Sequence, residues 1–126
     1  MTVYKKVNLY QSKPDQGKNT FGEVLEVLGN KVIRDTIMLL TEKDSLSGRL
    51  NVGYTVIYPQ CSTRGHEHAP LEEVYFITSG RGIMEVGQER FEIESGDVVY
   101  VPSAFHRAEN PFSVPLSYFW ITVKKD

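Results

Sequence analysis

Short runs of β-branched and aromatic residues, separated by turns that contain glycine or proline, fill the chain from residue 32 to residue 124. These runs occupy residues 32–40, 50–58, 73–78, 82–86, 91–94, 97–101 and 116–123. Runs spaced about 8–12 residues apart with turns between them are typical of strands in an antiparallel sandwich or barrel. Helical periodicity is weak and confined to residues 20–28, which fit a strand equally well. The pattern therefore predicts an all-β fold.

The length of 126 residues suits one domain with its own hydrophobic core. No internal repeat, low-complexity tract or linker divides the sequence. We expect a single domain over residues 1–126, with a core barrel over about residues 32–124. The segment 1–31 is expected to pack on the barrel or on a dimer partner.

Composition and charge argue against several classes of partner and against an oxidising compartment. The net charge of −2 and the absence of long like-charge runs argue against nucleic acid and anionic membranes as partners. Cys61 is the single cysteine, so no intrachain disulfide can form. No apolar run approaches the roughly 18 residues of a membrane span, and no signal peptide is visible at the N-terminus. A cytoplasmic location is the resulting expectation.

The three histidines of the chain have a placement that indicates a metal site. His66 and His68 are two residues apart, so both rings project from one face of an extended segment. Glu73 follows at the start of a predicted strand, and His106 lies where another strand begins. A lone His-x-His is usually only polar surface, and a single Glu at a strand start is usually solvated. The prediction rests on their joint placement, because three imidazoles and one carboxylate can bind a divalent metal and leave positions open for a substrate.

These residues fall into two motifs that resemble those of the cupin superfamily. Residues 66–80 match the first motif, from the His-x-His pair through Glu73 to Gly80, with Gly65 directly before the first histidine. Residues 96–110 match the second motif through its Gly, Pro, His and Asn positions. The turn at residues 103–105 is one residue shorter than in the family pattern and has Ala104 where a glycine is usual.

The resemblance implies a cupin-type antiparallel β-barrel, also called a jelly roll or double-stranded β-helix. It also implies one divalent metal ion per chain, bound by His66, His68, Glu73 and His106. The identity of the metal stays open among manganese, iron, nickel and zinc. Since cupins commonly dimerise, a homodimer is expected.

The spacing to Gly80 selects Glu73 rather than its neighbour Glu72 as the ligand. Neighbours on a strand point to opposite faces, so only one of the two carboxylates can enter the barrel. If Glu73 points inward, Tyr75 and Ile77 should do so too, while Val74 and Phe76 face outward. Outward apolar side chains need a cover, which either the second sheet or another subunit would supply.

A closer resemblance links residues 63–68, 73–75, 96–102 and 106–107 to the archaeal, cupin-type phosphoglucose isomerases. It implies that Thr63 and Gly65 help to bind a substrate phosphate and that Tyr75 lines a sugar pocket. Arg64 and Arg107 are further candidates for contact with a phosphate or a carboxylate. Glu72 and Tyr75 are the candidates for the general base.

Three functions remain open at this point. The first is a metal-dependent enzyme acting on a small polyoxygenated substrate, a carbohydrate or an organic acid, with isomerisation of a sugar or sugar phosphate as the best single interpretation. A bound metal would polarise a carbonyl and stabilise an enediolate. The second is a ferrous dioxygenase or a decarboxylase that uses the same site. The third is a non-catalytic module that binds a sugar or another metabolite.

Overall fold

The computed structural model describes residues 4–13, 34–63, 65 and 70–125 of the chain. Within these residues the chain forms nine strands and two short 3₁₀ helices, η1 (Leu9–Gln11) and η2 (Glu42–Asp44). The strands are β1 (Arg34–Leu40), β2 (Leu50–Ile57), β3 (Cys61–Ser62), β4 (Leu71–Ser79), β5 (Arg81–Val86), β6 (Glu89–Glu94), β7 (Val98–Val101), β8 (His106–Asn110) and β9 (Leu116–Lys124).

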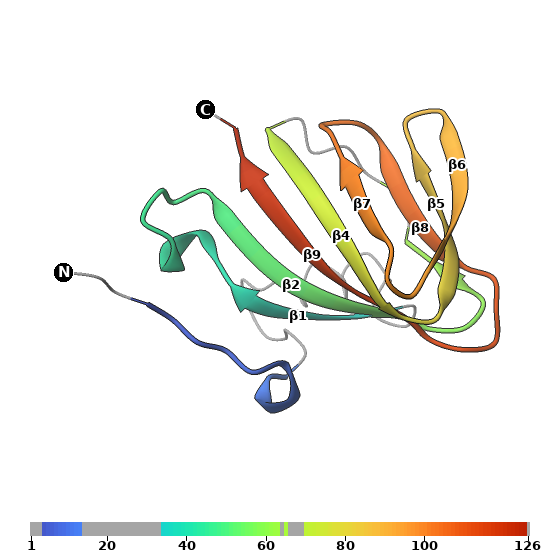
Figure 1. Ribbon diagram of the computed structural model, residues 1–126, viewed down its shortest axis with the longest axis horizontal. Helices are drawn as coiled ribbons and strands as arrows, with labels where there is room; N and C mark the ends of the chain where they lie inside the picture. Colours follow the sequence, from blue (N-terminus) through green and yellow to red (C-terminus); the bar gives the residue numbers. More distant parts are fainter. Residues whose placement is uncertain (1–3, 14–33, 64, 66–69, 126) are drawn as a thin grey trace.

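The strands form two sheets in which every described pairing is antiparallel. The larger sheet has the order β1-β2-β9-β4-β7 and the smaller one the order β3-β8-β5-β6. Neighbouring strands such as β4 and β9 are far apart in sequence, as the yellow-green and red ribbons in Figure 1 show. This arrangement confirms the predicted all-β jelly roll.

The alternation of side chains along β4 determines what this strand contributes to the interior. Glu73, Tyr75 and Ile77 are buried, whereas Phe76 is 46% exposed. Successive side chains on a strand project to opposite faces, so the three inward residues share one side of the sheet. The predicted inward and outward sets of β4 are therefore confirmed.

The hydrophobic core lies between the two sheets and joins residues from most strands. Its fully buried members are Ile57, Ile77, Met84, Val101 and Leu116. The β4–β5 turn depends on Gly80, which has a φ of 85°. A Cβ atom at this position would lie 2.3 Å from the carbonyl oxygen of Pro115, so no larger residue fits the turn without a shift of backbone.

Some short elements are absent from the pattern of predicted runs. The strand β3 has only two residues, and each 3₁₀ helix has only three. Elements this short show no readable hydrophobic period, so the sequence did not predict them. The strand β3 forms because Cys61 and Ser62 pair with the distant strand β8. The predicted alternatives for residues 20–28 concern a segment outside the described residues.

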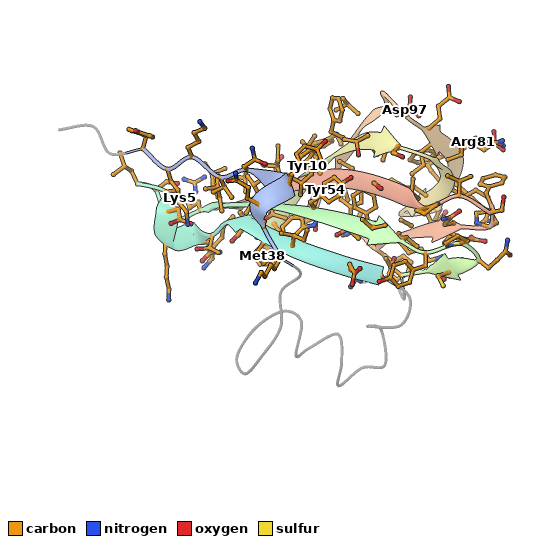
Figure 2. The ribbon with its side chains drawn as sticks, turned by 90° about the horizontal axis from the view of Figure 1, so that it is seen from below. Lys5, Tyr10, Met38, Tyr54, Arg81 and Asp97 are labelled. Atoms are coloured by element: carbon orange, nitrogen blue, oxygen red, sulfur yellow. The ribbon has the colours of Figure 1, made fainter. Side chains whose placement is uncertain are left out.

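The N-terminal segment 4–13 lies beside β1, outside the two sheets (Figures 1 and 2). Lys5 forms an ion pair with Asp44 of η2, with 3.1 Å between Nζ and Oδ2. The side chains of Tyr4 and Tyr10 on this segment are almost fully exposed. No helix in the described part of the chain is long and apolar enough to cross a membrane.

Candidate functional site

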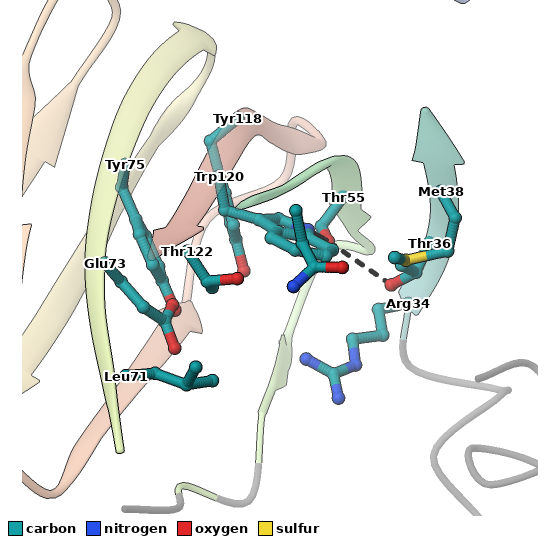
Figure 3. Close-up of a pocket in the computed structure, with 11 residues that line it drawn as sticks. Arg34, Thr36, Met38, Thr55, Leu71, Glu73, Tyr75, Tyr118, Trp120 and Thr122 are labelled. Atoms are coloured by element: carbon teal, nitrogen blue, oxygen red, sulfur yellow. Dashed lines mark hydrogen bonds between the residues drawn. The ribbon is translucent and has the colours of Figure 1, made fainter. Parts of the chain in front are cut away.

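A cavity of about 220 Å³ opens on the inner side of the larger sheet (Figure 3). Four strands build it, and each contributes residues at alternate positions, as expected for one face of a sheet. The lining residues are Arg34, Thr36 and Met38 from β1, Asn51 and Thr55 from β2, Leu71, Glu73 and Tyr75 from β4, and Tyr118, Trp120 and Thr122 from β9.

Glu73 lines this cavity and contacts His106, which is not itself a lining residue. Their Oε1 and Nε2 atoms are 3.4 Å apart, and the two side chains are only 6% and 3% exposed. Glu73 comes from β4 of the larger sheet and His106 from the start of β8 in the smaller sheet. The fold therefore brings together two of the four predicted metal ligands, which are 33 positions apart in the sequence.

The orientation of the His106 ring follows from a backbone contact. Its Nδ1 atom lies 3.0 Å from the carbonyl oxygen of Ala104, and a carbonyl can only accept a hydrogen bond. Nδ1 therefore carries the proton, and Nε2 faces the carboxylate of Glu73. A hydrogen bond from the second ring nitrogen to a backbone carbonyl is the usual way in which a metal-binding histidine is oriented.

The donor atoms of this pair fit a divalent metal. Carboxylate oxygen and imidazole nitrogen are common ligands of zinc, manganese, iron and nickel. Two donors that each lie about 2.1 Å from one ion are about 3.0–3.4 Å apart at octahedral or tetrahedral angles. The 3.4 Å between Glu73 and His106 agrees with this range. Within the described residues no group of three or more His, Cys, Asp or Glu side chains converges.

His66 and His68, the other two predicted ligands, lie outside the described residues, as does Arg64. Their predicted roles stay predictions.

The electrostatic balance at His106 has two opposing causes. Burial lowers the pKa of His106, but the hydrogen bond and charge of Glu73, together with the contact to the Ala104 carbonyl, raise it more. The pKa of the imidazole therefore lies above its ordinary value. Glu73 thus favours a positive charge at this point, whether a proton or a metal cation supplies it.

Two stacked tyrosines form the wall next to Glu73. The rings of Tyr75 and Tyr118 are 4.8 Å apart between centroids, with 11° between their planes. Burial, followed by the influence of Tyr118 and Glu73, raises the pKa of the Tyr75 hydroxyl well above its usual value. Burial likewise raises the pKa of Tyr118 to about 12. A neutral tyrosine hydroxyl can donate a hydrogen bond, and the role of Tyr75 as a general base stays a prediction.

Trp120 is the cross-strand neighbour of Tyr75 and continues this wall, and its position depends on a glycine. Its Nε1–H donates a hydrogen bond to Oγ1 of Thr55, with 3.0 Å between the two atoms. The indole lies directly over Gly53 of β2, where a Cβ atom would be only 2.0 Å from the ring. Gly53 thus provides the room in which the indole lies along the cavity.

Glu72 and Arg107, two predicted site residues, point away from the cavity. Glu72 accepts a hydrogen bond from the hydroxyl of Tyr100, with 2.5 Å between the oxygens. Tyr100 is exposed on the outer face of the larger sheet, so Glu72 faces that side too. Arg107 forms ion pairs of 3.3 Å with both Glu85 and Glu109 on the smaller sheet. Neither residue lines the cavity.

Thr63 and Gly65 have structural contacts that account for their residue types. The Oγ1 atom of Thr63 accepts a hydrogen bond from the backbone N–H of Ala108 and donates one to its carbonyl. Thr63 is thus an extension of the β3–β8 pairing. Gly65 has a φ of 86°, and a Cβ atom there would lie 2.4 Å from the ring of Phe105. Neither lines the cavity, and a contact with substrate phosphate stays a prediction for both.

Arg34, Tyr118 and Trp120 are cavity residues that the motifs did not indicate. A signal for them was present in the alternation of the strands, since Arg34, Thr36 and Met38 are two residues apart, as are Tyr118 and Trp120. The pattern alone could not tell which side of each strand faces the cavity. That depends on the pairing of β2 with both β1 and β9.

Comparison with known proteins extends these observations. Residues 53–122, more than half of the chain, match the protein family described as Cupin domain. The protein MJ1618 of Methanocaldococcus jannaschii is 44% identical over 52 residues, which are 40% of this chain and 42% of that protein. SCO3923 of Streptomyces coelicolor is 50% identical over 32 residues, 25% of this chain and 30% of that protein. The matched segments thus span less than half the length of either relative.

Solved structures share the fold at low sequence identity. A predicted oxalate decarboxylase of Thermotoga maritima superposes with a TM-score of 0.75 at 17% identity, covering 95% of this chain and 99% of that one. The protein plu4264 of Photorhabdus luminescens has a TM-score of 0.66 at 15% identity, with 99% and 90% covered. A cupin domain from an XRE family transcriptional regulator of Enterobacter cloacae has a TM-score of 0.66 at 13% identity, with 75% and 99% covered.

Proposed function

The chain belongs to the cupin family, and from this premise we propose that it is a metal-dependent enzyme acting on a small oxygen-rich substrate. The observation that carries the proposal is the buried pair of Glu73, which lines the cavity, and His106. A buried carboxylate oxygen and an imidazole nitrogen whose facing atoms are 3.4 Å apart form a donor pair of the kind that binds a divalent cation.

The proposed metal would be bound by Glu73 and His106 together with His66 and His68. When bound, a divalent ion supplies Lewis-acid chemistry that polarises a carbonyl or hydroxyl of the substrate. The surrounding groups would then have distinct roles. The backbone carbonyl of Ala104 orients the imidazole of His106. Tyr75 would donate a hydrogen bond to a substrate oxygen, and Trp120 and Tyr118 would exclude water from the carbon skeleton.

Aldose–ketose isomerisation is the first reaction to test, because the motif residues resemble those of the cupin-type phosphoglucose isomerases. Decarboxylation of a small organic acid, or its oxidation by dioxygen at ferrous iron, is the alternative. The similar fold of a predicted oxalate decarboxylase supports including decarboxylation in the same assays. The third candidate function is metabolite binding without turnover. The cupin domain of a transcriptional regulator, which has a similar fold, supports including it.

The test starts from elemental analysis of protein purified without added metal, followed by titration with manganese, iron, nickel and zinc. We expect about one ion per chain, and a loss of at least tenfold in metal affinity for Glu73→Gln and for His106→Gln. Glu72→Gln is the matched control, because it alters the neighbouring carboxylate on the outer face. Equal metal binding by all three variants would contradict the proposed ligands.

Activity assays separate the three functions. An isomerase loses turnover when the metal is removed and is indifferent to oxygen, whereas a dioxygenase stops under anaerobic conditions. A decarboxylase releases carbon dioxide from an acid substrate. Metal-dependent ligand binding without turnover across a panel of sugars, sugar phosphates and organic acids would favour the binding module. Full turnover in metal-stripped protein would rule out the metal-dependent enzyme.

We also propose that two copies associate through the outer face of β7, β4 and β9. Phe76 pairs with Val98 on one side and with Phe119 on the other, and Val74 pairs in the same way with Tyr100 and Ile121. Several of these side chains are exposed, including Phe76 at 46% and Val98 at 62%. A continuous apolar face of this kind can pack against the same face of a second copy in a two-fold interface.

A further inference from the structure

We propose that Arg34 binds the carboxylate of a small organic acid inside the cavity, so that the substrate of this site is an acid rather than a neutral sugar. The proposal deepens the proposed function by naming the class of substrate, and it rests on the cavity being the substrate site. Its basis is the position of Arg34, the chemistry of the walls and the size of the cavity.

Arg34 lies on the opposite side of the cavity from Glu73. It starts β1, whereas Glu73 belongs to β4, and two strands of the sheet, β2 and β9, separate them. Figure 3 shows the guanidinium group of Arg34 directed from β1 toward the open centre of the cavity. The cavity therefore has a cationic end at Arg34 and an anionic end at Glu73.

The influence of Arg34 reaches the tyrosine wall. Burial is the main cause of the raised pKa of Tyr118, and the charge of Arg34 is the strongest opposing effect. Burial also dominates at Tyr75, where Arg34 again lowers the pKa while Glu73 raises it. The guanidinium and the carboxylate thus act on the same two hydroxyl groups from opposite ends of the cavity.

A carboxylate is the group that this cationic end suits best. The planar guanidinium presents N–H donors in a fork that matches the two oxygens of a carboxylate, and such charged hydrogen bonds are stronger in a partly enclosed site than in water. A ligand bound there would direct its other oxygen atoms toward Glu73 and His106. Its carboxylate would then be recognised separately from the end at which chemistry takes place.

The walls between the two ends favour a short carbon skeleton over a polyol. Their apolar part comes from Met38, Leu71, Trp120 and the two tyrosine rings. Among the polar groups of the walls, the hydroxyls of Thr36 and Thr55 already hydrogen-bond each other, and that of Thr55 also accepts from Trp120. A neutral sugar would need a polar partner for each of its hydroxyls. The volume of about 220 Å³ is also below the roughly 300–1,000 Å³ usual for larger ligands.

Trp120 provides a direct measurement of binding, because it lines the cavity and is the single tryptophan of the chain. The ligands to titrate are lactate and pyruvate, each beside its neutral amide, together with glucose and glucose 6-phosphate. We expect lactate or pyruvate to change the fluorescence with an affinity at least about tenfold higher than that of its amide. Glucose should bind no better than the amides.

Variants of Arg34 assign this preference to one side chain. Arg34→Gln should reduce the affinity for the acid by about tenfold or more while leaving that for the amide within about twofold, and Arg34→Lys should retain part of the preference. Arg81→Gln is the matched control. Arg81 lies on β5 beside Phe112, at the far end of the molecule from Met38, which lines the cavity (Figure 2). The Arg81→Gln variant should bind lactate, pyruvate and their amides with the same affinities as the unchanged protein.

The titrations are done on both metal-loaded and metal-stripped protein, so that this proposal and the metal proposal can fail separately. A preference for the acid that persists in stripped protein and in Glu73→Gln supports Arg34 even if no metal binds. Equal affinity for acid and amide in the unchanged protein would overturn the proposal. So would an unchanged preference in a folded Arg34→Gln variant, or selective binding of glucose 6-phosphate over both acids.

Discussion

The walls of the cavity depend on single residues whose size or polarity has a local reason. Gly53 is the clearest example, because its missing side chain leaves the space that the indole of Trp120 occupies. Thr55, two residues further along β2, then accepts the hydrogen bond from the indole N–H and fixes the ring in that space. A buried threonine and a glycine on one strand therefore determine the position of an aromatic residue on the next strand.

Replacing Gly53 by alanine should displace Trp120. The new Cβ atom would overlap the indole, and such overpacking costs about 1–3 kcal/mol of unfolding free energy. Fluorescence should show a shifted Trp120 emission maximum, and denaturant titration should give the lower stability. Val52→Ala, on the outward face of the same strand, is the control and should leave the emission maximum in place. An unshifted maximum in Gly53→Ala would show that the ring is held in another way.

Tyr58 provides a pH-dependent contact away from the cavity. Its hydroxyl donates a hydrogen bond to Oδ2 of Asp35, and this bond, followed by burial, raises the pKa of Tyr58 to about 12. Because the pKa is higher in the folded than in the unfolded chain, the contact stabilises the fold fully below about pH 10 and is lost as the pH rises toward 12.

Absorbance titration of tyrosinate should show that Tyr58 and Tyr118 both ionise near pH 12, and Tyr58→Phe should reduce this step by one group. Asp35→Asn should bring the pKa of Tyr58 back toward 10, because the carboxylate that opposes ionisation is gone. A titration curve that is the same for Asp35→Asn and the unchanged protein would contradict the assignment.

At the scale of the elements, the end of β8 organises the connection to β9. Asn110 is fully buried, and its side-chain amide donates hydrogen bonds to the carbonyls of Ile57 and Val114. Its Oδ1 atom accepts a hydrogen bond from the backbone N–H of Phe112. One side chain thus joins β2, β8 and the loop before β9. This explains the asparagine at the end of the second motif by its hydrogen bonds rather than by contact with a ligand.

Asn110→Ala should destabilise the protein by at least about 2 kcal/mol, because it leaves several buried backbone groups without their partner. Chemical denaturation followed by circular dichroism measures this loss. Ser113→Ala, an exposed change in the same loop, should alter stability by less than about 0.5 kcal/mol. If both variants unfolded at the same denaturant concentration, Asn110 would have no such role in the loop.

For the molecule as a whole, the outer face of the larger sheet decides whether the chain acts alone. The exposed side chains of Phe76, Val98 and Tyr100 lie on adjacent strands of this face. The outer side of the smaller sheet differs, since Arg90 and Arg107 each pair there with Glu85 and Glu109. The contrast between an apolar and a charged outer face is the reason to expect association through the larger sheet.

Light scattering with size-exclusion chromatography should find a dimer at micromolar concentration, and Phe76→Lys with Val98→Lys should yield a monomer of similar fold. Introducing charge into an apolar interface costs its desolvation, so the effect should be large. Glu92→Lys, on β6 of the smaller sheet, is the control and should stay dimeric. A monomeric unchanged protein, or a double variant that remains dimeric, would refute association through this face.

The sequence by itself determined the longer strands, the inward set of β4 and the family, but not the two-residue strand β3. These properties are local: alternation, turn residues and motif spacing are all read within about 15 residues, and the predicted Glu73, Tyr75 and Ile77 are indeed buried. The same reasoning placed Glu72 on the opposite face from Glu73, where Tyr100 now contacts it.

Only the tertiary structure decided which residues surround the cavity. Arg34, Thr55 and Trp120 come from three strands, and their convergence depends on the register of β1 with β2 and of β2 with β9. A shift of one residue in either register would turn these side chains to the outer face. The contact between Glu73 and His106 likewise depends on two sheets closing over a shared core. The motifs predicted that Glu73 and His106 would meet, but the local alternation around Arg34 and Trp120 did not show which side of their strands faces the cavity.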